Sequence, residues 1–244
     1  MKEWYKDDLA YIHDVGYSNY ALKSTPGIIE ILNQSGIQDG LVVDLGCGSG
    51  ISAQELTKAN YRILGIDISE SMIAIARKRV ANAEFRVESF FKAEILPCHA
   101  VISISECFNY LFDSDTSGEM LVDLFERIYK ALVSGGVLIF DIAEPGQIAQ
   151  GITTKGFNEG DDWIVLVEKN EEQKQGILTR RIITFRKVGE YYRRDHEVHY
   201  QQLYEATDIA QKLRKIGFQV EIVRSYGEYN LPKAHAAFIA RKSV

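Results

Sequence analysis

Short apolar runs and amphipathic segments alternate along the first 145 residues of the chain. The apolar runs predict five strands, over residues 41–45, 62–67, 84–88, 99–105 and 137–141. Helical periodicity predicts helices over 26–34, from the glycines near 50 to about 59, over 70–80 and over 118–132. Ser69 is placed to cap the helix over 70–80, and Gly135-Gly136 to end the last helix. Strands that alternate with helices indicate a parallel sheet covered on both faces.

The pattern changes after residue 145. Three segments rich in β-branched and aromatic residues follow one another without a helix, at 163–169, 177–187 and 195–204. Consecutive strands without crossovers form an antiparallel meander. Alternation puts Trp163, Val165 and Val167 on one face, and Val198, Tyr200 and Tyr204 on another. A helix over 205–216 and strands over 218–224 and 235–241 complete the pattern.

Together these elements predict an α/β fold, a doubly wound seven-stranded sheet with an antiparallel β insert after strand five. We expect three parts: a core with an N-terminal lid segment over 1–150, the insert over 151–204, and a piece over 205–244 that completes the sheet.

Composition narrows the classes of function. The 244 residues include 28 Lys and Arg against 34 Asp and Glu, a net charge of −6, so nucleic-acid binding through bulk positive charge is disfavoured. Three cysteines without a C-x-x-C pair, and no apolar leader, predict a reduced, cytoplasmic protein. No stretch approaches the roughly 20 apolar residues of a membrane span. His196 and His199 have ligand-like spacing but no third ligand nearby, so no metal is expected.

The strongest chemical signal is the segment Val43-Asp44-Leu45-Gly46-Cys47-Gly48-Ser49-Gly50 between a strand and a helix. Its glycines let a ligand lie against the backbone, and the free N–H groups of the helix start suit a polar group. A dinucleotide fingerprint requires a third glycine at position 51, which is Ile51. Asp67 ends the second strand, where an acid accepts hydrogen bonds from ribose hydroxyls. A ligand with a ribose, an ammonium group and no pyrophosphate fits better than NAD.

With the segments VVDLGCGSG (42–50) and GIDIS (65–69), the chain resembles the class I S-adenosylmethionine (SAM)-dependent methyltransferases. The resemblance implies a Rossmann-like sheet, SAM as cofactor, and cofactor contacts from Asp44, Gly46, Cys47, Gly48, Gly50, Asp67, Ile68, Ser89, Phe90 and Ser105. Asp67 and Ile68 would contact the ribose, and Ser89 and Phe90 the adenine. Many family members carry Asp where Ser89 stands, so a hydroxyl or backbone contact must replace that carboxylate. AYIHDVGYSNYA, FRVESF and ECFNYLFD look like a group of bacterial methyltransferases without an assigned substrate.

Candidates for the acceptor side follow strand four. Glu106 could be a general base or an ammonium partner, or it could cap a short helix. Asn109 and Tyr110 could orient the substrate or the methionine moiety, or only pack. In the N-terminal stretch, Tyr11, Tyr17 and Tyr20 could fold over the cofactor, or pack against the sheet.

The insert holds the only concentration of basic residues, with eight Lys or Arg against three Glu between 169 and 194. A solvated sheet face, an anionic substrate or an oligomer contact would each explain it. We expect the insert to form an acceptor wall and a possible homodimer contact. The favoured function is methyl transfer from SAM to an N or O nucleophile of a small molecule. An RNA- or tRNA-modifying methyltransferase and a non-catalytic SAM-binding regulator are the alternatives.

Overall fold

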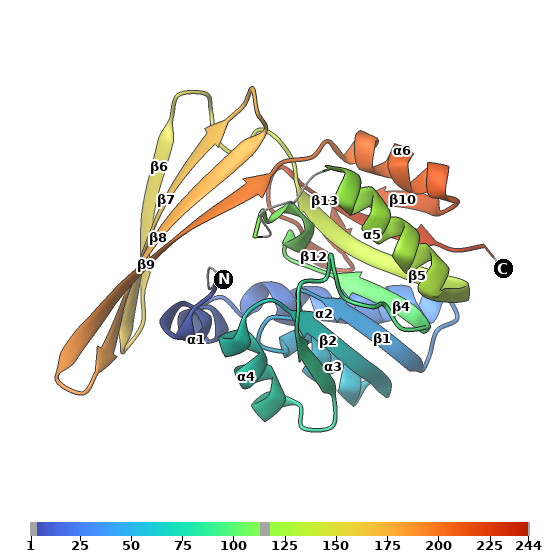
Figure 1. The fold of residues 1–244 in the computed structure, drawn as a ribbon, viewed down its shortest axis with the longest axis horizontal. Helices are drawn as coiled ribbons and strands as arrows, with labels where there is room; N and C mark the ends of the chain where they lie inside the picture. Colours follow the sequence, from blue (N-terminus) through green and yellow to red (C-terminus); the bar gives the residue numbers. More distant parts are fainter. Residues whose placement is uncertain (1–3, 113–117, 244) are drawn as a thin grey trace.

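A seven-stranded sheet forms the centre of the computed structural model, which describes residues 4–112 and 118–243 (Figure 1). The strand order is β10-β13-β5-β4-β1-β2-β3. The bounds are β1 Gly40–Leu45, β2 Tyr61–Asp67, β3 Glu84–Val87, β4 Cys98–Ser103, β5 Leu132–Ala143, β10 Gln219–Val223 and β13 His235–Arg241. Strands β1 to β5 pair in parallel, and β13 runs antiparallel to both of its neighbours. The predicted doubly wound α/β sheet with an antiparallel insert is confirmed.

Helices cover both faces of this sheet and create two separate cores. One core packs α2 (Asn19–Gln34), α3 (Ile51–Lys58) and α4 (Glu70–Arg79) against residues such as Val42 and Ile139. The other core packs α5 (Gly118–Ala131) and α6 (Ala206–Ile216) against residues such as Val43 and Phe140. These two residues directly follow Val42 and Ile139 in the sequence. Successive residues of a strand point to opposite faces, so these apolar runs supply both cores at once.

Two helix boundaries differ from the sequence prediction. Helix α2 begins at Asn19 rather than near residue 26, and Pro26 lies inside it. The preceding turn is supported by the hydroxyls of Ser24 and Thr25, which donate to the carbonyls of Tyr20 and Ala21. Helix α5 ends at Ala131, so Gly135 and Gly136 belong to β5 rather than to the end of the helix. The cap by Ser69 is confirmed, since its Oγ accepts from Met72 N at 3.1 Å.

The insert has four strands rather than three. Its order is β6-β7-β8-β9, with bounds β6 Thr153–Glu159, β7 Trp163–Glu172, β8 Ile177–Val188 and β9 Tyr191–Gln202. The missed strand, β6, is polar, contains Gly156 and is exposed along its whole length, so it shows no alternation. As Figure 1 shows, this sheet projects from one side of the core.

The insert has an inner face, which carries Trp163, Val165 and Ile182, and an outer face turned to solvent. The inner residues pack on Leu9 and Ile12 of α1 (Asp7–Gly16). The shared face of Trp163, Val165 and Val167 is confirmed by the pairing register. Val198 and Tyr200 share the outer face, but Tyr204 lies beyond the end of β9 and packs against the core.

A small hairpin, β11 (Ser225–Tyr226) and β12 (Tyr229–Asn230), escaped the sequence analysis. It reaches α2, where a Cβ on Gly27 would lie 2.2 Å from the backbone of Tyr226. Glycine at this position therefore permits the close approach of the helix and the hairpin. Among the described residues, no helix is both long and apolar enough to cross a membrane.

Candidate active site

The glycine loop between β1 and α3 forms one wall of a pocket. The N–H groups of Gly46 and Cys47 donate to Ile66 O, at 2.8 and 3.2 Å, which fastens the loop to β2. Gly48 has φ +52°, and a Cβ built on it would meet no atom within 4 Å. The backbone at Gly48 thus borders open space that a ligand can fill.

Asp67 lies at the carboxyl end of β2 and faces this pocket. Its two carboxylate oxygens accept from Gly48 N at 2.9 Å and from Ser69 N at 2.8 Å. Burial raises the pKa of Asp67, although the backbone N–H donors oppose the shift. Asp67 therefore ties the glycine loop to the start of α4, and its oxygens border the pocket.

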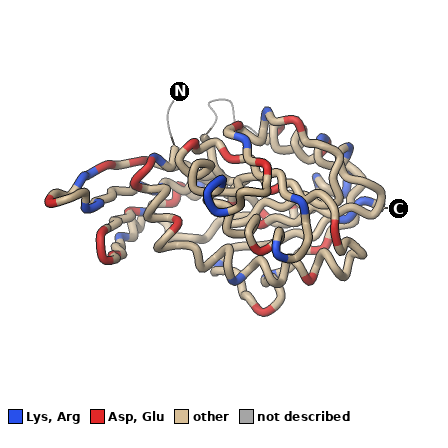
Figure 2. Tube along the Cα trace, turned by 90° about the horizontal axis from the view of Figure 1, so that it is seen from below, with Lys and Arg blue, Asp and Glu red and all other residues tan. Residues whose placement is uncertain are grey.

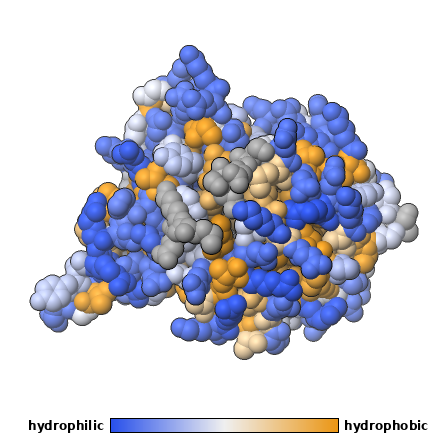
Figure 3. Space-filling model, in the orientation of Figure 1, coloured by the Kyte–Doolittle hydropathy of each residue, from blue (hydrophilic) through white to orange (hydrophobic). Residues whose placement is uncertain are grey.

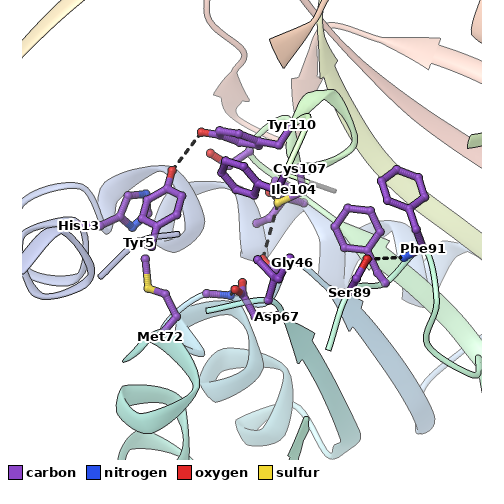
Figure 4. Close-up of a pocket in the computed structure, with 15 residues that line it drawn as sticks. Tyr5, His13, Gly46, Asp67, Met72, Ser89, Phe91, Ile104, Cys107 and Tyr110 are labelled. Atoms are coloured by element: carbon purple, nitrogen blue, oxygen red, sulfur yellow. Dashed lines mark hydrogen bonds between the residues drawn. The ribbon is translucent and has the colours of Figure 1, made fainter. Parts of the chain in front are cut away.

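The structure brings half of the predicted cofactor and acceptor residues together in the pocket. Those that line the pocket are Gly46, Gly48, Asp67, Ile68, Ser89, Phe90, Ser105 and Tyr110. Seven others complete the lining and were missed as site residues: Tyr5, His13, Met72, Phe91, Ile104, Cys107 and Phe112. Figure 4 shows Tyr5 and His13 on the side of the pocket opposite Ser89 and Phe91. Most of the missed residues are apolar or aromatic, a type that sequence patterns assign to the core.

Three predicted residues of the glycine loop region lie outside the pocket lining. Asp44 is 2% exposed, and burial together with the nearby Asp67 raises its pKa to about 7. Cys47 is buried, with its Sγ against Gly65. Gly50, with φ +78°, ends the loop at the start of α3, where a Cβ would lie 3.0 Å from Ala76. These residues shape the loop from behind.

The turn after β4 is held in a strained conformation. Ser105 and Glu106 both have left-handed backbone angles, with φ +67° and +50°. The carboxylate of Asp141, at the end of β5, accepts from both N–H groups, at 3.0 and 2.6 Å, and from Tyr226 Oη at 3.1 Å. Left-handed non-glycine residues persist only where neighbours hold them and are common at active sites. The sequence analysis did not single out Asp141, although an acid at the end of an apolar strand was a signal that could have found it.

Glu106 takes part in a buried ion-pair network rather than facing the pocket. Its Oε1 lies 2.6 Å from Arg180 Nη2, and its Oε2 lies 3.4 Å from His235 Nε2. Burial works against ionisation, but Arg180 and His235 hold the pKa of Glu106 well below its usual range. Arg180 also donates to Tyr110 Oη at 3.2 Å, which lies 3.0 Å from Tyr5 Oη. The network therefore connects the insert to the pocket.

Asn109, in the short helix η1 (Cys107–Asn109), is fully buried and has its amide engaged. Its Nδ2 donates to the carbonyls of Ala143 and Gln202, and its Oδ1 accepts from Ala143 N. The side chain thus links β5 to the end of the insert. It does not line the pocket, so of the two alternatives for Asn109, orienting a ligand or packing, its contacts favour packing.

The three candidate tyrosines of the N-terminal stretch also lie outside the pocket lining. Tyr11 Oη donates to Asp162, and the Arg186 guanidinium lies 3.6 Å from its ring centroid. Tyr17 Oη accepts from the side chain of Asn158 in the insert at 2.7 Å. Tyr20 is partly buried, and its hydroxyl has no hydrogen-bond partner among the described residues.

The aromatic residues of this stretch that reach the pocket are Tyr5 and His13. Two N–H groups of the stretch, those of Tyr5 and Lys6, donate to the carboxylate of Glu197, each at 2.9 Å. Asp8 pairs with Arg193 and Arg186 of the insert. The insert therefore holds the N-terminal stretch over the pocket. Burial lowers the pKa of His13 to about 4, so its imidazole is neutral at pH 7.

The described residues contain no group of three metal-ligating side chains. His196 and His199 point to opposite faces of β9, because they are three residues apart on a strand. His199 is fully buried, with its Nε2 2.7 Å from Glu197 Oε2. The alternation along β9 therefore prevents the two histidines from sharing one ion.

Comparison with known proteins agrees with this geometry. A family model described as a methyltransferase domain matches residues 42–136, which span the glycine loop, Asp67, most of β1 and strands β2 to β4. The chain is a class I SAM-dependent methyltransferase. SAM is its cofactor, and the open backbone at Gly48 and the carboxylate of Asp67 fit it. This methyltransferase is 24% identical over 218 residues to YqeM of Bacillus subtilis (strain 168), a protein provisionally named a methyltransferase, covering 84% of this chain and 85% of that one.

Other relatives differ in their acceptors. An 18S rRNA (guanine(1575)-N(7))-methyltransferase of Saccharomyces cerevisiae is 29% identical over 153 residues, which cover 57% of this chain and 54% of the relative. A SAM-dependent methyltransferase from Clostridium acetobutylicum has a TM-score of 0.80 at 21% identity, covering 96% and 98% of the two chains. SAM-bound CalS10, an amino pentose methyltransferase from Micromonospora echinaspora, has a TM-score of 0.76 at 13% identity, covering 100% and 99%. The structural matches extend over the insert as well as the core.

Proposed function

We propose that this methyltransferase acts in the cytoplasm on an N or O nucleophile of a small molecule. The observation that carries the proposal is the N-terminal stretch, which places Tyr5 and His13 over the pocket opposite Ser89 and Phe91 (Figure 4). A covered pocket suits a small acceptor better than a polymer. The nearly full-length structural likeness to an amino pentose methyltransferase supports the same class of acceptor.

The charge distribution argues against a nucleic-acid acceptor. Acidic and basic residues are interspersed along the insert (Figure 2), and hydrophilic surface predominates on the face in Figure 3. Three of the basic residues of the insert have internal carboxylate partners, since Arg180 pairs with Glu106, and Arg186 and Arg193 pair with Asp8. A phosphate backbone needs a continuous stripe of available cations.

The roles of the residues follow from their places in the pocket. Bound SAM supplies a methyl group activated by a sulfonium, with Asp67 and Ile68 proposed at the ribose and Ser89 and Phe90 at the adenine. Ser105, on the strained turn, also lines the pocket and is proposed to contact SAM. Tyr110 orients the acceptor, and Glu106 acts through Arg180 to hold Tyr110 in place. His13 lines the pocket as a neutral imidazole, and its lowered pKa makes it a weak proton acceptor.

We also propose that the outer face of the insert forms a homodimer contact. Phe157 is 66% exposed and Leu166 40% exposed, and they lie directly opposite each other on β6 and β7. Ile183 of β8 continues the row. Sedimentation of the wild type and of Leu166→Glu tests the contact: a dimer that the substitution dissociates supports it, and a monomeric wild type refutes it.

Turnover against a panel of small amines and alcohols, with S-adenosylhomocysteine as the readout, tests the function. Acceptor-dependent product formation supports the proposal. Methylation of RNA in place of any small molecule would favour an RNA-modifying enzyme. SAM binding without turnover on either class would favour a regulator.

A further inference from the structure

Two cations lie side by side on the inner face of the insert. Lys169 of β7 and Arg180 of β8 are directly opposite each other in the antiparallel register, so their side chains share a face. Arg180 is mostly buried, with 16% of its side chain exposed. Like charges directly opposite each other on a sheet are destabilising, so this pair needs an explanation.

The buried carboxylates near this pair are already engaged. Glu106 binds Arg180 through Oε1 and His235 through Oε2. Glu171, on the same face, accepts from the N–H groups of Gly146 and Ile148, both at 2.8 Å. Glu197, also on that face, accepts from the N–H groups of Tyr5 and Lys6 and from His199.

Among the described residues Lys169 therefore has no ion pair, and Glu106 acts on its charge only from a longer distance. Within residues 4–112 and 118–243, its ammonium has no carboxylate in contact. Burial and the neighbouring Arg180 lower the pKa of Lys169, and Glu106 opposes this shift. By contrast, Arg186 and Arg193, further along the same face, have Asp8 between them.

Unpartnered buried polar atoms lie on Arg180 and on the neighbouring strand β9. Arg180 Nε, His199 Nδ1 and both amide atoms of Gln201 are buried without a hydrogen-bond partner among the described residues. His199 lies directly opposite Arg180, and Gln201 is two residues further along the same face of β9. Buried polar atoms are nearly always paired, so a group of unpaired ones indicates a place where water or a polar ligand can bind.

This cluster adjoins the active-site pocket, because Arg180 donates to Tyr110, which lines the pocket. Resting on the proposed small-molecule function, we propose that the methyl acceptor carries an oxyanion group, a carboxylate or a phosphate. The group binds Lys169 and Arg180, and the nucleophile reaches the pocket beside Tyr110. Arg180 Nε and the Lys169 ammonium supply charge-assisted donors, which are the strong ones.

Anion binding tests the site without knowledge of the acceptor. Protein saturated with S-adenosylhomocysteine is titrated by calorimetry with succinate, with inorganic pyrophosphate and with neutral succinamide. We expect one of the two anions to bind in the millimolar range and succinamide not to bind. Lys169→Met should weaken the anion by about 10- to 100-fold. Arg181→Met, one residue along β8 on the exposed outer face, is the matched control and should change nothing.

Failure of both anions to bind, or equal binding by the Lys169→Met protein, would overturn the proposal. If Lys169→Met lowers the affinity for S-adenosylhomocysteine, its fold is compromised, and Lys169→Gln replaces it. The difference between succinate and pyrophosphate identifies the carboxylate or the phosphate as the preferred group.

Transfer of a deuterated methyl group from SAM to a pool of bacterial metabolites provides the second test. We expect the labelled product to be an anion at neutral pH, and Lys169→Met to raise its KM with little change in kcat. A neutral or cationic product refutes the oxyanion and leaves the proposed function intact. Absence of any labelled small molecule contradicts the proposed function itself, whereas the calorimetric result still decides the anion site.

Discussion

The side chain of Asp67 offers the sharpest test of the cofactor site. Its two oxygens hold the N–H groups of Gly48 and Ser69 at 2.9 and 2.8 Å while they border the pocket. A hydrogen bond to a charged group contributes about 1.5–3 kcal/mol, and rearrangement of the loop can offset part of that contribution when the carboxylate is removed. Asp67→Ala should therefore weaken SAM binding by about 1–3 kcal/mol, or about 5- to 150-fold in Kd.

Calorimetry with SAM and with S-adenosylhomocysteine measures this effect. Asp67→Asn retains an acceptor oxygen without the charge and should lie between the wild type and Asp67→Ala. Asp161→Ala, at an exposed turn of the insert, removes the same group at a distance and should have no effect. Unchanged SAM affinity in a folded Asp67→Ala protein, or tighter binding of NAD than of SAM, would refute the assignment.

The pH dependence of SAM binding follows from the same carboxylate. Burial raises the pKa of Asp67, and ribose hydroxyls donate to its ionised form. SAM affinity should therefore fall as the pH is lowered through this raised pKa, starting at a higher pH than for an exposed aspartate. Asp67→Asn should remove this dependence, and a profile equal to that of the wild type would contradict the argument.

Three further predictions address the loop and the acceptor side. The pKa of Asp44 is raised from 3.8 to about 7, so the folded state holds a proton that the unfolded state has released, and stability falls as pH rises between these values. Asp44→Asn should raise the free energy of unfolding of the cofactor-free protein near neutral pH by up to about 4 kcal/mol, measured by thermal or urea unfolding. No gain in the free energy of unfolding would show that the buried carboxylate does not destabilise the fold. Gly48→Ala should lower SAM affinity at least about 10-fold by calorimetry, whereas Gly189→Ala, with a similar positive φ and equally open space, should cost only stability. Glu106→Gln should lower the melting temperature and turnover, because Arg180 loses its counter-charge. It should leave the acidic limb of the pH–rate profile unchanged. A flattened acidic limb would instead support the hypothesis that Glu106 is a general base.

Local sequence determined the cofactor half of the site. The glycines of the loop, the apolar run before them and Asp67 after the next strand are close in sequence, and parallel strands end at the same edge. The adjacent strand ends must then place Gly48 and Asp67 together. In the structure, Gly48 N lies 2.9 Å from Asp67 Oδ2. The order of strands and helices likewise followed from periodicity, because each period fixes which residues are buried.

Only the tertiary structure decided the part of the pocket that is proposed to hold the acceptor. Tyr5, Tyr110 and Arg180 are brought together over separations of 105 and 70 residues, through an insert that packs on α1. No local pattern encodes such contacts, since tyrosines and arginines occupy packed and solvated positions equally well. The sequence analysis proposed Glu106 for the acceptor side, but the ionisation of Glu106 depends on Arg180, a cation 74 residues away. Periodicity specifies which side of a strand is buried, whereas the residues that this side contacts depend on how the two sheets pack. The pKa of a buried charged group is set by those contacts.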